Sequence, residues 1–219
     1  MTERTSVLLV DDQELIRKGF AMILDVEDDI VVVGEARDGA DAVRKVAQLA
    51  PDVVLMDVQM PDMDGIAATE RIVAEHPATR VVILTTFDDD EYLFASLEAG
   101  ASGFLLKNCP PEELVQAIGR AAQGHSLLAP EVTQRVIERS TARGPRERDP
   151  RLETLTERER DVLVAMATGQ SNAEIAAGLF VSNATVKSHV SSILAKVQAR
   201  DRVQAVILAH ESGLMDGTD

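Results

Sequence analysis

Five polar side chains of the sequence each stand at the end of a short apolar run: Asp11, Asp12, Asp57, Thr85 and Lys107. Clustered carboxylates repel one another and therefore invite a divalent cation, and Mg²⁺ prefers oxygen ligands. A carboxylate can also act as a nucleophile and form an acyl phosphate. A lysine and a hydroxyl can stabilise the charge on a phosphoryl group. These residue types predict phosphoryl transfer at a magnesium site, provided that the fold brings them together.

The apolar runs that lead to these residues are typical of strands in a parallel sheet, because they lack the alternation that marks a half-buried strand. Strands are expected near residues 7–10, 30–33, 52–56, 81–84 and 103–106. Stretches with helical apolar spacing separate them, so strand and helix alternate five times, which predicts a doubly wound α/β fold. The carboxyl ends of parallel strands share one edge of a sheet. The five polar residues should therefore converge there.

The helical stretches also predict which side chains face the core. The expected inward residues are Leu15, Ile16, Phe20, Ile23 and Leu24 in the first stretch, and Ala42, Val43, Val46 and Leu49 in the second. A turn with Pro61 and Asp64-Gly65 follows Asp57 and leads into a helix over residues 64–75. This acidic turn also has a plainer interpretation as a solvated loop after a strand.

Residues 6–124 resemble the receiver domain of two-component response regulators. The matching pieces are Asp11-Asp12, Asp57 with Met60-Pro61 and Asp64-Gly65, Thr85, and Gly103-Phe104-Leu105-Leu106-Lys107. The resemblance implies a flavodoxin-like fold with five parallel strands and a sensor histidine kinase as partner. It implies Asp57 as the phosphoacceptor, and Mg²⁺ held by Asp11, Asp12, Asp57 and the backbone carbonyl of Gln59. It also implies that Thr85 and Phe104 form a switch pair and that Lys107 assists the chemistry.

The chain changes character after residue 124. Pro130 opens a short helical pattern, and residues 140–150 are polar, charged and punctuated by Pro and Gly, which predicts a flexible tether. We therefore expect a receiver domain over residues 1–124, a linker with a short helix over 125–150, and a second domain over 151–219.

The last 69 residues predict an all-α domain of four helices. Thr156 with Glu159 and Ser171 with Glu174 form capping boxes at two helix starts, and Gly169 should end the first helix. Ser182 should cap a third helix, and a fourth is expected from about residue 202. Two short helices joined by a tight turn form a helix-turn-helix arrangement.

The third of these helices presents polar residues that suit DNA. Lys187, Ser188 and Ser191 share an exposed face of its N-terminal half, the part that usually reaches base edges. Ser182, Thr185 and Lys196 complete the predicted set of DNA-contacting residues. By composition alone, a solvated helix fits as well as a reading helix. The near-neutral charge of this domain, which lacks a basic footprint, counts mildly against DNA binding.

Residues 152–213 resemble the LuxR-type helix-turn-helix domain. The resemblance is carried by residues 155–159 (LTERE), 169–176 (GQSNAEIA) and 185–190 (TVKSHV). With the receiver in front, the whole chain resembles the NarL/FixJ group of response regulators. This implies a bacterial transcription regulator that binds double-stranded operator DNA and is not an enzyme beyond its own phosphotransfer and autodephosphorylation. We expect a homodimer on phosphorylation, reached by receiver pairing or by release of the DNA-binding domain, with RNA polymerase as a further partner.

The composition of the chain fits a cytoplasmic protein with no membrane partner. Residues 1–125 carry 24 Asp/Glu against 10 Lys/Arg, and Cys109 is the single cysteine, which suits a reducing compartment. Two other functions, an aspartyl-phosphate phosphatase and a regulator that acts through protein contacts alone, fit these residues less well. A phosphatase of the haloacid dehalogenase type needs a second acid two residues after the nucleophile, where this chain has Gln59. A regulator that acts through protein contacts alone would not need the acidic set with Lys107.

Overall fold

The structure is a computed structural model that describes residues 4–86, 90–124, 149–212 and 214–215. The chain divides into two compact units, Met1–Leu127 and Leu128–Asp219, and each is described by itself. The short helix predicted from Pro130 and most of the predicted tether lie outside the described residues. In the part of the chain that is described, no helix combines the length and hydropathy needed to cross a membrane.

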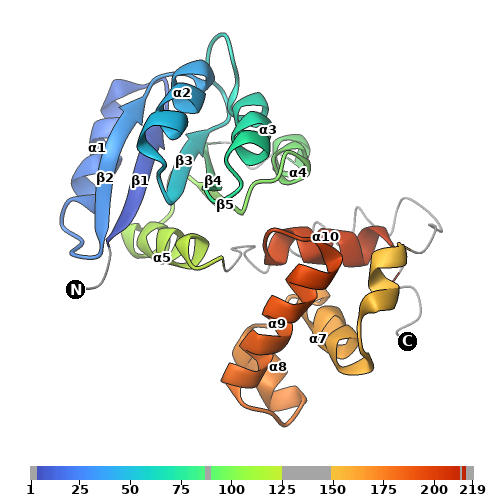
Figure 1. The fold of residues 1–219 in the computed structure, drawn as a ribbon. Helices are drawn as coiled ribbons and strands as arrows, with labels where there is room; N and C mark the ends of the chain where they lie inside the picture. Colours follow the sequence, from blue (N-terminus) through green and yellow to red (C-terminus); the bar gives the residue numbers. More distant parts are fainter. Residues whose placement is uncertain (1–3, 87–89, 125–148, 213, 216–219) are drawn as a thin grey trace. The chain divides into compact units, whose positions relative to one another are not determined.

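The first unit contains a five-stranded parallel sheet (Figure 1). Its strands are β1 (Thr5–Val10), β2 (Ile30–Ala36), β3 (Val53–Asp57), β4 (Arg80–Thr85) and β5 (Gly103–Leu106). The strand order is β2-β1-β3-β4-β5, and every neighbouring pair is parallel. The predicted doubly wound α/β fold is confirmed. The direction of winding reverses between β1 and β3, which is where open α/β sheets bind their ligands.

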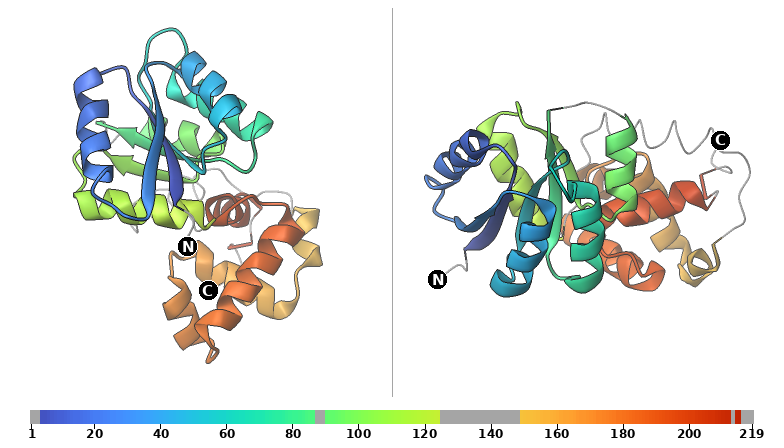
Figure 2. Two further views of the ribbon diagram at one scale, coloured as in Figure 1. Left: turned by 60° about the vertical axis from the view of Figure 1, so that its left-hand side comes forward. Right: turned by 90° about the horizontal axis from the view of Figure 1, so that it is seen from above.

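Five helices cover the two faces of this sheet. They are α1 (Glu14–Leu24), α2 (Gly39–Leu49), α3 (Gly65–Glu75), α4 (Asp90–Glu98) and α5 (Pro111–Ala122). Figure 2 shows α1 and α5 on one face and α2, α3 and α4 on the other. On the first face, Leu24 of α1 and Leu114 and Ile118 of α5 pack against sheet residues such as Leu9 and Leu55. The two-layered cover buries the strands on both sides, so all five residues of β3 are buried.

Two side chains predicted to face the core do not. Leu15 is 84% exposed and Leu49 is 42% exposed. Leu15 lies in the first turn of α1 and is exposed like Met22 of the same helix, whereas Leu24 is the buried residue of this helix. Leu49 is the last residue of α2 and extends over the edge strand β2, where its Cδ1 lies 2.8 Å from the position that a Cβ on Gly34 would take. Both errors come from end turns, where one residue of register decides the face.

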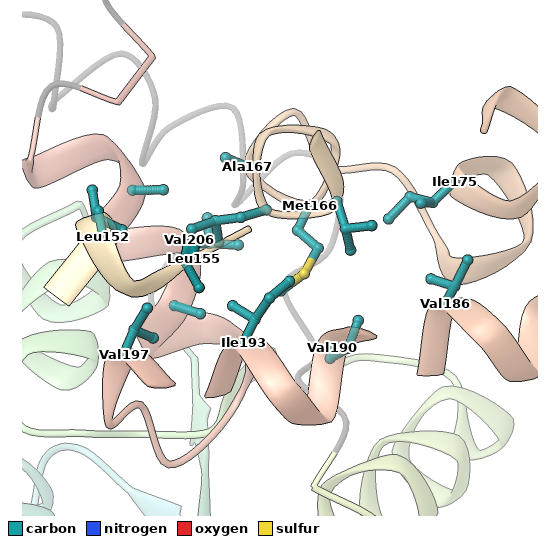
Figure 3. Close-up of a cluster of buried hydrophobic side chains, with 14 of the residues drawn as sticks. Leu152, Leu155, Met166, Ala167, Ile175, Val186, Val190, Ile193, Val197 and Val206 are labelled. Carbon is teal, nitrogen blue, oxygen red and sulfur yellow. The ribbon is translucent and has the colours of Figure 1, made fainter. Parts of the chain in front are cut away.

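The second unit is helical, as predicted. A 3₁₀ helix, η1 (Pro150–Thr154), precedes α7 (Glu157–Ala167), α8 (Asn172–Gly178), α9 (Asn183–Val197) and α10 (Arg202–Glu211). Figure 3 shows their shared core, in which Met166 of α7 reaches toward Ile193 of α9, and Ile175 of α8 lies near Val186. Asp149 caps η1, so the last two residues of the predicted tether already belong to an ordered element.

Local sequence signals explain where these helices begin and end. Both predicted capping boxes are present: Thr156 and Ser171 each accept the backbone N–H three residues on, and the glutamates at those positions bond back. Gly169 follows α7 with a φ of 83°, a left-handed conformation that favours glycine and ends the helix. Ser182 caps α9 by accepting from the N–H of Thr185. The short turn between Gly178 and Asn183 thus separates α8 from α9, the second helix of the helix-turn-helix.

Candidate functional site

The strand register brings the predicted acids together. Val10 of β1 pairs with Met56 of β3, so the next residues along, Asp11 and Asp57, stand side by side at the carboxyl edge of the sheet. Carboxylate oxygens of Asp11, Asp12 and Asp57 lie within 4.8 Å of one another. The donor set consists of three carboxylates around one point, which suits a hard divalent cation that binds oxygen. The geometry of these three carboxylates therefore fits a metal site.

Lys107 completes this cluster from β5. Leu106 pairs with Thr85 of β4, and the backbone N–H of Lys107 donates to the carbonyl of Thr85 at 2.8 Å. The Lys107 Nζ lies 2.6 Å from Asp11 Oδ2 and 2.9 Å from Asp57 Oδ2, and all three side chains are buried. One ammonium group thus bridges two carboxylates that would otherwise repel each other.

The electrostatics of the cluster favour a reactive carboxylate. Burial raises the pKa of Asp57, and the negative charge of Asp11 adds to this, while the bond to Lys107 opposes it. Burial alone would lower the pKa of Lys107, but its hydrogen bonds to Asp11 and Asp57 outweigh that effect and raise it. Lys107 is therefore held as a cation beside Asp57. A group that adds negative charge at Asp57 would find this cation already in place.

The turn after β3 is shaped by close backbone approach. The N–H of Gly65 donates to the carbonyl of Val58 at 2.9 Å. A Cβ on Gly65 would lie 1.9 Å from the backbone oxygen of Asp57, so only glycine fits at this position. Asp64 then caps α3 by accepting from the N–H of Ala67 at 2.8 Å. The Asp64-Gly65 pair thus folds α3 back against the end of β3 and fixes the position of Asp57.

The predicted switch pair occupies neighbouring strands. Thr85 and Phe104 are 1% and 4% exposed, and Phe104 pairs in register with Ile83, two residues before Thr85. The sheet thus brings Thr85 to the same edge as the acids, and it places Phe104 two residue pairs further from that edge on the neighbouring strand.

Two further residues support the site through contacts that the sequence pattern does not predict. Arg17 of α1 donates from Nη1 to the backbone oxygen of Asp11 at 2.7 Å and forms an ion pair with Glu35 at 3.2 Å. It thereby holds the loop that carries Asp11. Gln59 donates from Nε2 to the Tyr92 hydroxyl of α4 at 2.7 Å. The Arg17 contact spans six residues and the Gln59 contact spans 33, and apolar spacing predicts neither of them.

The predicted DNA-contacting residues of α9 divide into two groups. Ser182, Thr185, Lys187, Ser188 and Ser191 are all exposed. The hydroxyls of Ser182 and Thr185 lie 2.8 Å apart, and Ser191 donates back to the carbonyl of Lys187 at 3.1 Å. Among the described residues, Lys187 has no ion-pair partner. These five residues thus leave a cation and several hydroxyls open to solvent along the N-terminal part of α9.

Lys196 is different, because it forms a contact within the protein. Its Nζ lies 2.6 Å from Glu159 Oε2, and Ser192 donates to Glu159 Oε1 at 2.6 Å. Glu159 is the last member of the first capping box and is 5% exposed. Its bonds to Lys196, Ser192 and Thr156 lower its pKa to about 2. This network ties α9 to the start of α7. A phosphate contact by Lys196 stays a prediction.

Both units match known families over nearly their whole described length. Residues 7–119 match the response regulator receiver domain. Residues 153–209 match the bacterial regulatory proteins of the luxR family. The two matches cover the acidic cluster and the helix-turn-helix respectively.

Full-length relatives share both parts in the same order. The chain is 41% identical to the transcriptional regulatory protein LiaR of Bacillus subtilis over 96% of this chain and 99% of that protein. It is 39% identical to the response regulator protein VraR of Staphylococcus aureus over 95% and 98% of the two chains. Among solved structures, the response regulator ChrA of a haem-sensing two-component system is 38% identical, with a TM-score of 0.53, over 96% of this chain and 98% of that one.

Proposed function

The chain belongs to the two-component response regulators that join a receiver domain to a LuxR-type DNA-binding domain, and we propose that phosphorylation of Asp57 switches its binding to DNA. The family consists of transcription regulators rather than enzymes, and its two domains imply a kinase and DNA as partners in general. The observation that carries the proposal is the buried cluster in which Asp11, Asp57 and Lys107 meet within hydrogen-bonding distance.

The receiver chemistry follows from this cluster. An Asp57 carboxylate oxygen attacks the phosphorus of a phosphorylated histidine on a sensor kinase, and the bond from phosphorus to the histidine nitrogen breaks with its electron pair on the nitrogen. Asp11, Asp12, Asp57 and the backbone carbonyl of Gln59 would hold Mg²⁺, which when bound neutralises charge on the phosphoryl oxygens. The Lys107 ammonium offsets the remaining charge. The Thr85 hydroxyl donates a hydrogen bond to a phosphoryl oxygen.

The switch works by adding charge at one point. Phosphorylation adds nearly two negative charges, and the response of Thr85 and Phe104 shifts an existing equilibrium of the receiver. A near-complete switch requires that the phosphoryl group favour the active state by roughly 5 kcal/mol.

DNA recognition rests on the exposed face of α9. Lys187, Ser188 and Ser191 reach base edges, while Ser182 and Thr185 contact phosphates at the N-terminus of the helix. The domain carries few cations, so one copy binds weakly. Two copies linked as a homodimer can gain about 10²- to 10⁴-fold through effective concentration. We place this dimer in the cytoplasm on operator DNA, with RNA polymerase as a further partner.

Two routes connect the receiver to the DNA. In one, phosphorylated receivers pair and bring two reading domains together. In the other, phosphorylation releases a reading domain that the receiver covers. The same proposal includes the bounds of the three parts. They are a receiver domain over residues 1–124, a linker over 125–150 and a DNA-binding domain over 151–219.

The proposal is tested by binding of the full-length protein to genomic DNA fragments, with and without acetyl phosphate and Mg²⁺. Phosphodonor should enrich a defined set of fragments with the wild-type protein and should enrich none with Asp57→Asn. The control is Asp62→Asn, an exposed acid of the same loop whose φ of 65° an asparagine also adopts, and it should behave as the wild type. Equal enrichment with and without phosphodonor would refute the switch.

A further comparison separates the two routes. Receiver pairing predicts a doubled mass on phosphorylation and poor binding by a fragment of residues 149–219. Release predicts that this fragment binds as well as the phosphorylated whole protein.

A further inference from the structure

A hydrogen bond joins the loop after Asp57 to α4. Gln59, two residues after Asp57, donates from Nε2 to the hydroxyl of Tyr92 at 2.7 Å. Gln59 belongs to the loop that leaves β3, whereas Tyr92 lies in the first turn of α4. The bond therefore ties the loop beside Asp57 to a helix from a distant part of the chain. The Gln59 side chain is exposed, so this bond, and not packing, decides where its amide points.

The bond borders an open cleft beside Asp57. The cleft has a volume of about 510 Å³, and its lining includes Asp12, Val58, Gln59 and Tyr92. The Asp57 side chain itself is only 6% exposed. Asp12 lines this cleft, and its carboxylate oxygen lies within 4.8 Å of that of Asp57, so the cleft lies next to the acidic cluster. A phosphoryl group on Asp57 would meet water on this side.

The chemistry of an acyl phosphate makes that water important. In hydrolysis, the water oxygen bonds to phosphorus, and the bond from phosphorus to the Asp57 oxygen breaks with its electron pair on the carboxylate. Dihydrogen phosphate leaves and exchanges protons with solvent. A glutamine amide beside a phosphoryl group can orient such a water, as a glutamine does in GTP-hydrolysing enzymes. Gln59 lines the cleft beside the acidic cluster, and its amide is bound to Tyr92.

We propose that Tyr92 is a positioning residue that lengthens the life of the acyl phosphate on Asp57 by holding the Gln59 amide away from the attacking water. This inference rests on the proposed phosphorylation of Asp57 and adds a control on how long it lasts. Loss of the Tyr92 hydroxyl frees the amide to turn toward the phosphoryl group. The same bond also makes the lifetime depend on the position of α4, so a partner that moves this helix would change the lifetime too.

The test measures decay of the phosphorylated full-length protein after acetyl phosphate is removed, in Mg²⁺ buffer, on phosphate-affinity gels. Tyr92→Phe keeps the ring and removes the hydroxyl. Its half-life should be about 2- to 10-fold shorter than that of the wild type, which is the range expected for loss of one hydrogen bond. Gln59→Leu should decay no faster than the wild type. The double variant should decay at the rate of Gln59→Leu, because Tyr92 acts through Gln59.

Two controls separate positioning from a general loss of structure. Gln116→Leu makes the same chemical change at an exposed position of α5 and should leave the half-life unchanged. Thermal unfolding of Tyr92→Phe should match that of the wild type.

The outcomes of this test distinguish a failure of the inference from a failure of the proposed function. A Tyr92→Phe half-life equal to that of a wild-type protein that labels normally would overturn this inference and leave the proposed function standing. Faster decay from Tyr92→Phe in the Gln59→Leu background would also overturn it, since the effect would then bypass the amide. A wild-type protein that takes no label would remove the proposed function, and this inference with it.

Discussion

Replacing Lys196 by methionine should destabilise the second unit, because it removes the ion pair with Glu159. Methionine keeps the aliphatic stem but removes the ammonium that lies 2.6 Å from Glu159. The carboxylate of Glu159 would then be left 5% exposed without its countercharge. A hydrogen bond to a charged group typically contributes about 1.5–3 kcal/mol. Because the Lys196 side chain is 34% exposed, solvent screens part of its interaction with Glu159. We therefore expect the free energy of unfolding of the second unit to fall by about 2 kcal/mol.

The expected loss is large for a unit of this size. For a domain of 60–100 residues, 1 kcal/mol shifts the melting temperature by roughly 4–8 °C, so the shift should be about 8–16 °C. The folded-state pKa of Glu159 is about 2, below its ordinary value of 4.5. The stabilisation is therefore present above pH 4.5 and is lost as the pH falls through 2.

Calorimetry of the full-length protein, with hydrogen exchange at the amides of α7 and α9 to assign the transition, measures this change. Lys187→Met is the matched control, because Lys187 is exposed on the same helix without an ion-pair partner among the described residues. It should change stability by less than about 0.5 kcal/mol. A melting temperature of Lys196→Met equal to that of the wild type would contradict this stabilisation. A salt dependence of DNA binding whose slope falls by about one in the variant would separately support the predicted phosphate contact of Lys196.

Four further predictions each concern one residue. Gly65→Ala forces a Cβ to within 1.9 Å of the Asp57 oxygen, so it should cost at least about 3 kcal/mol and abolish labelling by acetyl phosphate; normal labelling would contradict the geometry. Phe180→Gly should stabilise the second unit by roughly 0.5–1 kcal/mol in thermal melts, because Phe180 has a φ of 55° and is 96% exposed; a lower melting temperature would count against strain there. Lys187→Ala should lose roughly 5- to 150-fold in specific DNA affinity in gel shifts, whereas unchanged affinity would reject its role. Burial lowers the pKa of His210 below 6.5. The melting temperature of the second unit should therefore fall as the pH drops below 6.5, because the unfolded state binds the proton more readily. A melting temperature that does not change with pH in this range would refute this.

The sequence was most informative for features that a short local pattern determines, such as the end of a strand or the start of a helix. The acids, Thr85 and Lys107 could be found because each follows an apolar run, and a parallel sheet brings strand ends together whatever the details of packing. The capping boxes could be found because their partners are three residues apart.

The contacts that the sequence did not reveal join side chains to groups on other parts of the fold. Arg17 to the Asp11 carbonyl, Gln59 to Tyr92, and Lys196 to Glu159 each depend on how two elements pack. Helical spacing gives the face of a side chain but not its partner across a gap. For the same reason the exposed position of Leu15 was mispredicted, since apolar character alone does not separate two adjacent stripes of a short helix.

The most direct test of the central claim is the site of phosphorylation. Full-length wild-type protein and Asp57→Asn are incubated with acetyl phosphate and Mg²⁺, and acid-labile phosphate is measured by intact mass and located by peptide mapping. We predict one phosphoryl group per wild-type chain, on the peptide that contains Asp57, and none on Asp57→Asn. Labelling of Asp57→Asn at the wild-type rate, or a phosphoryl group on another residue of the wild-type protein, would contradict the account.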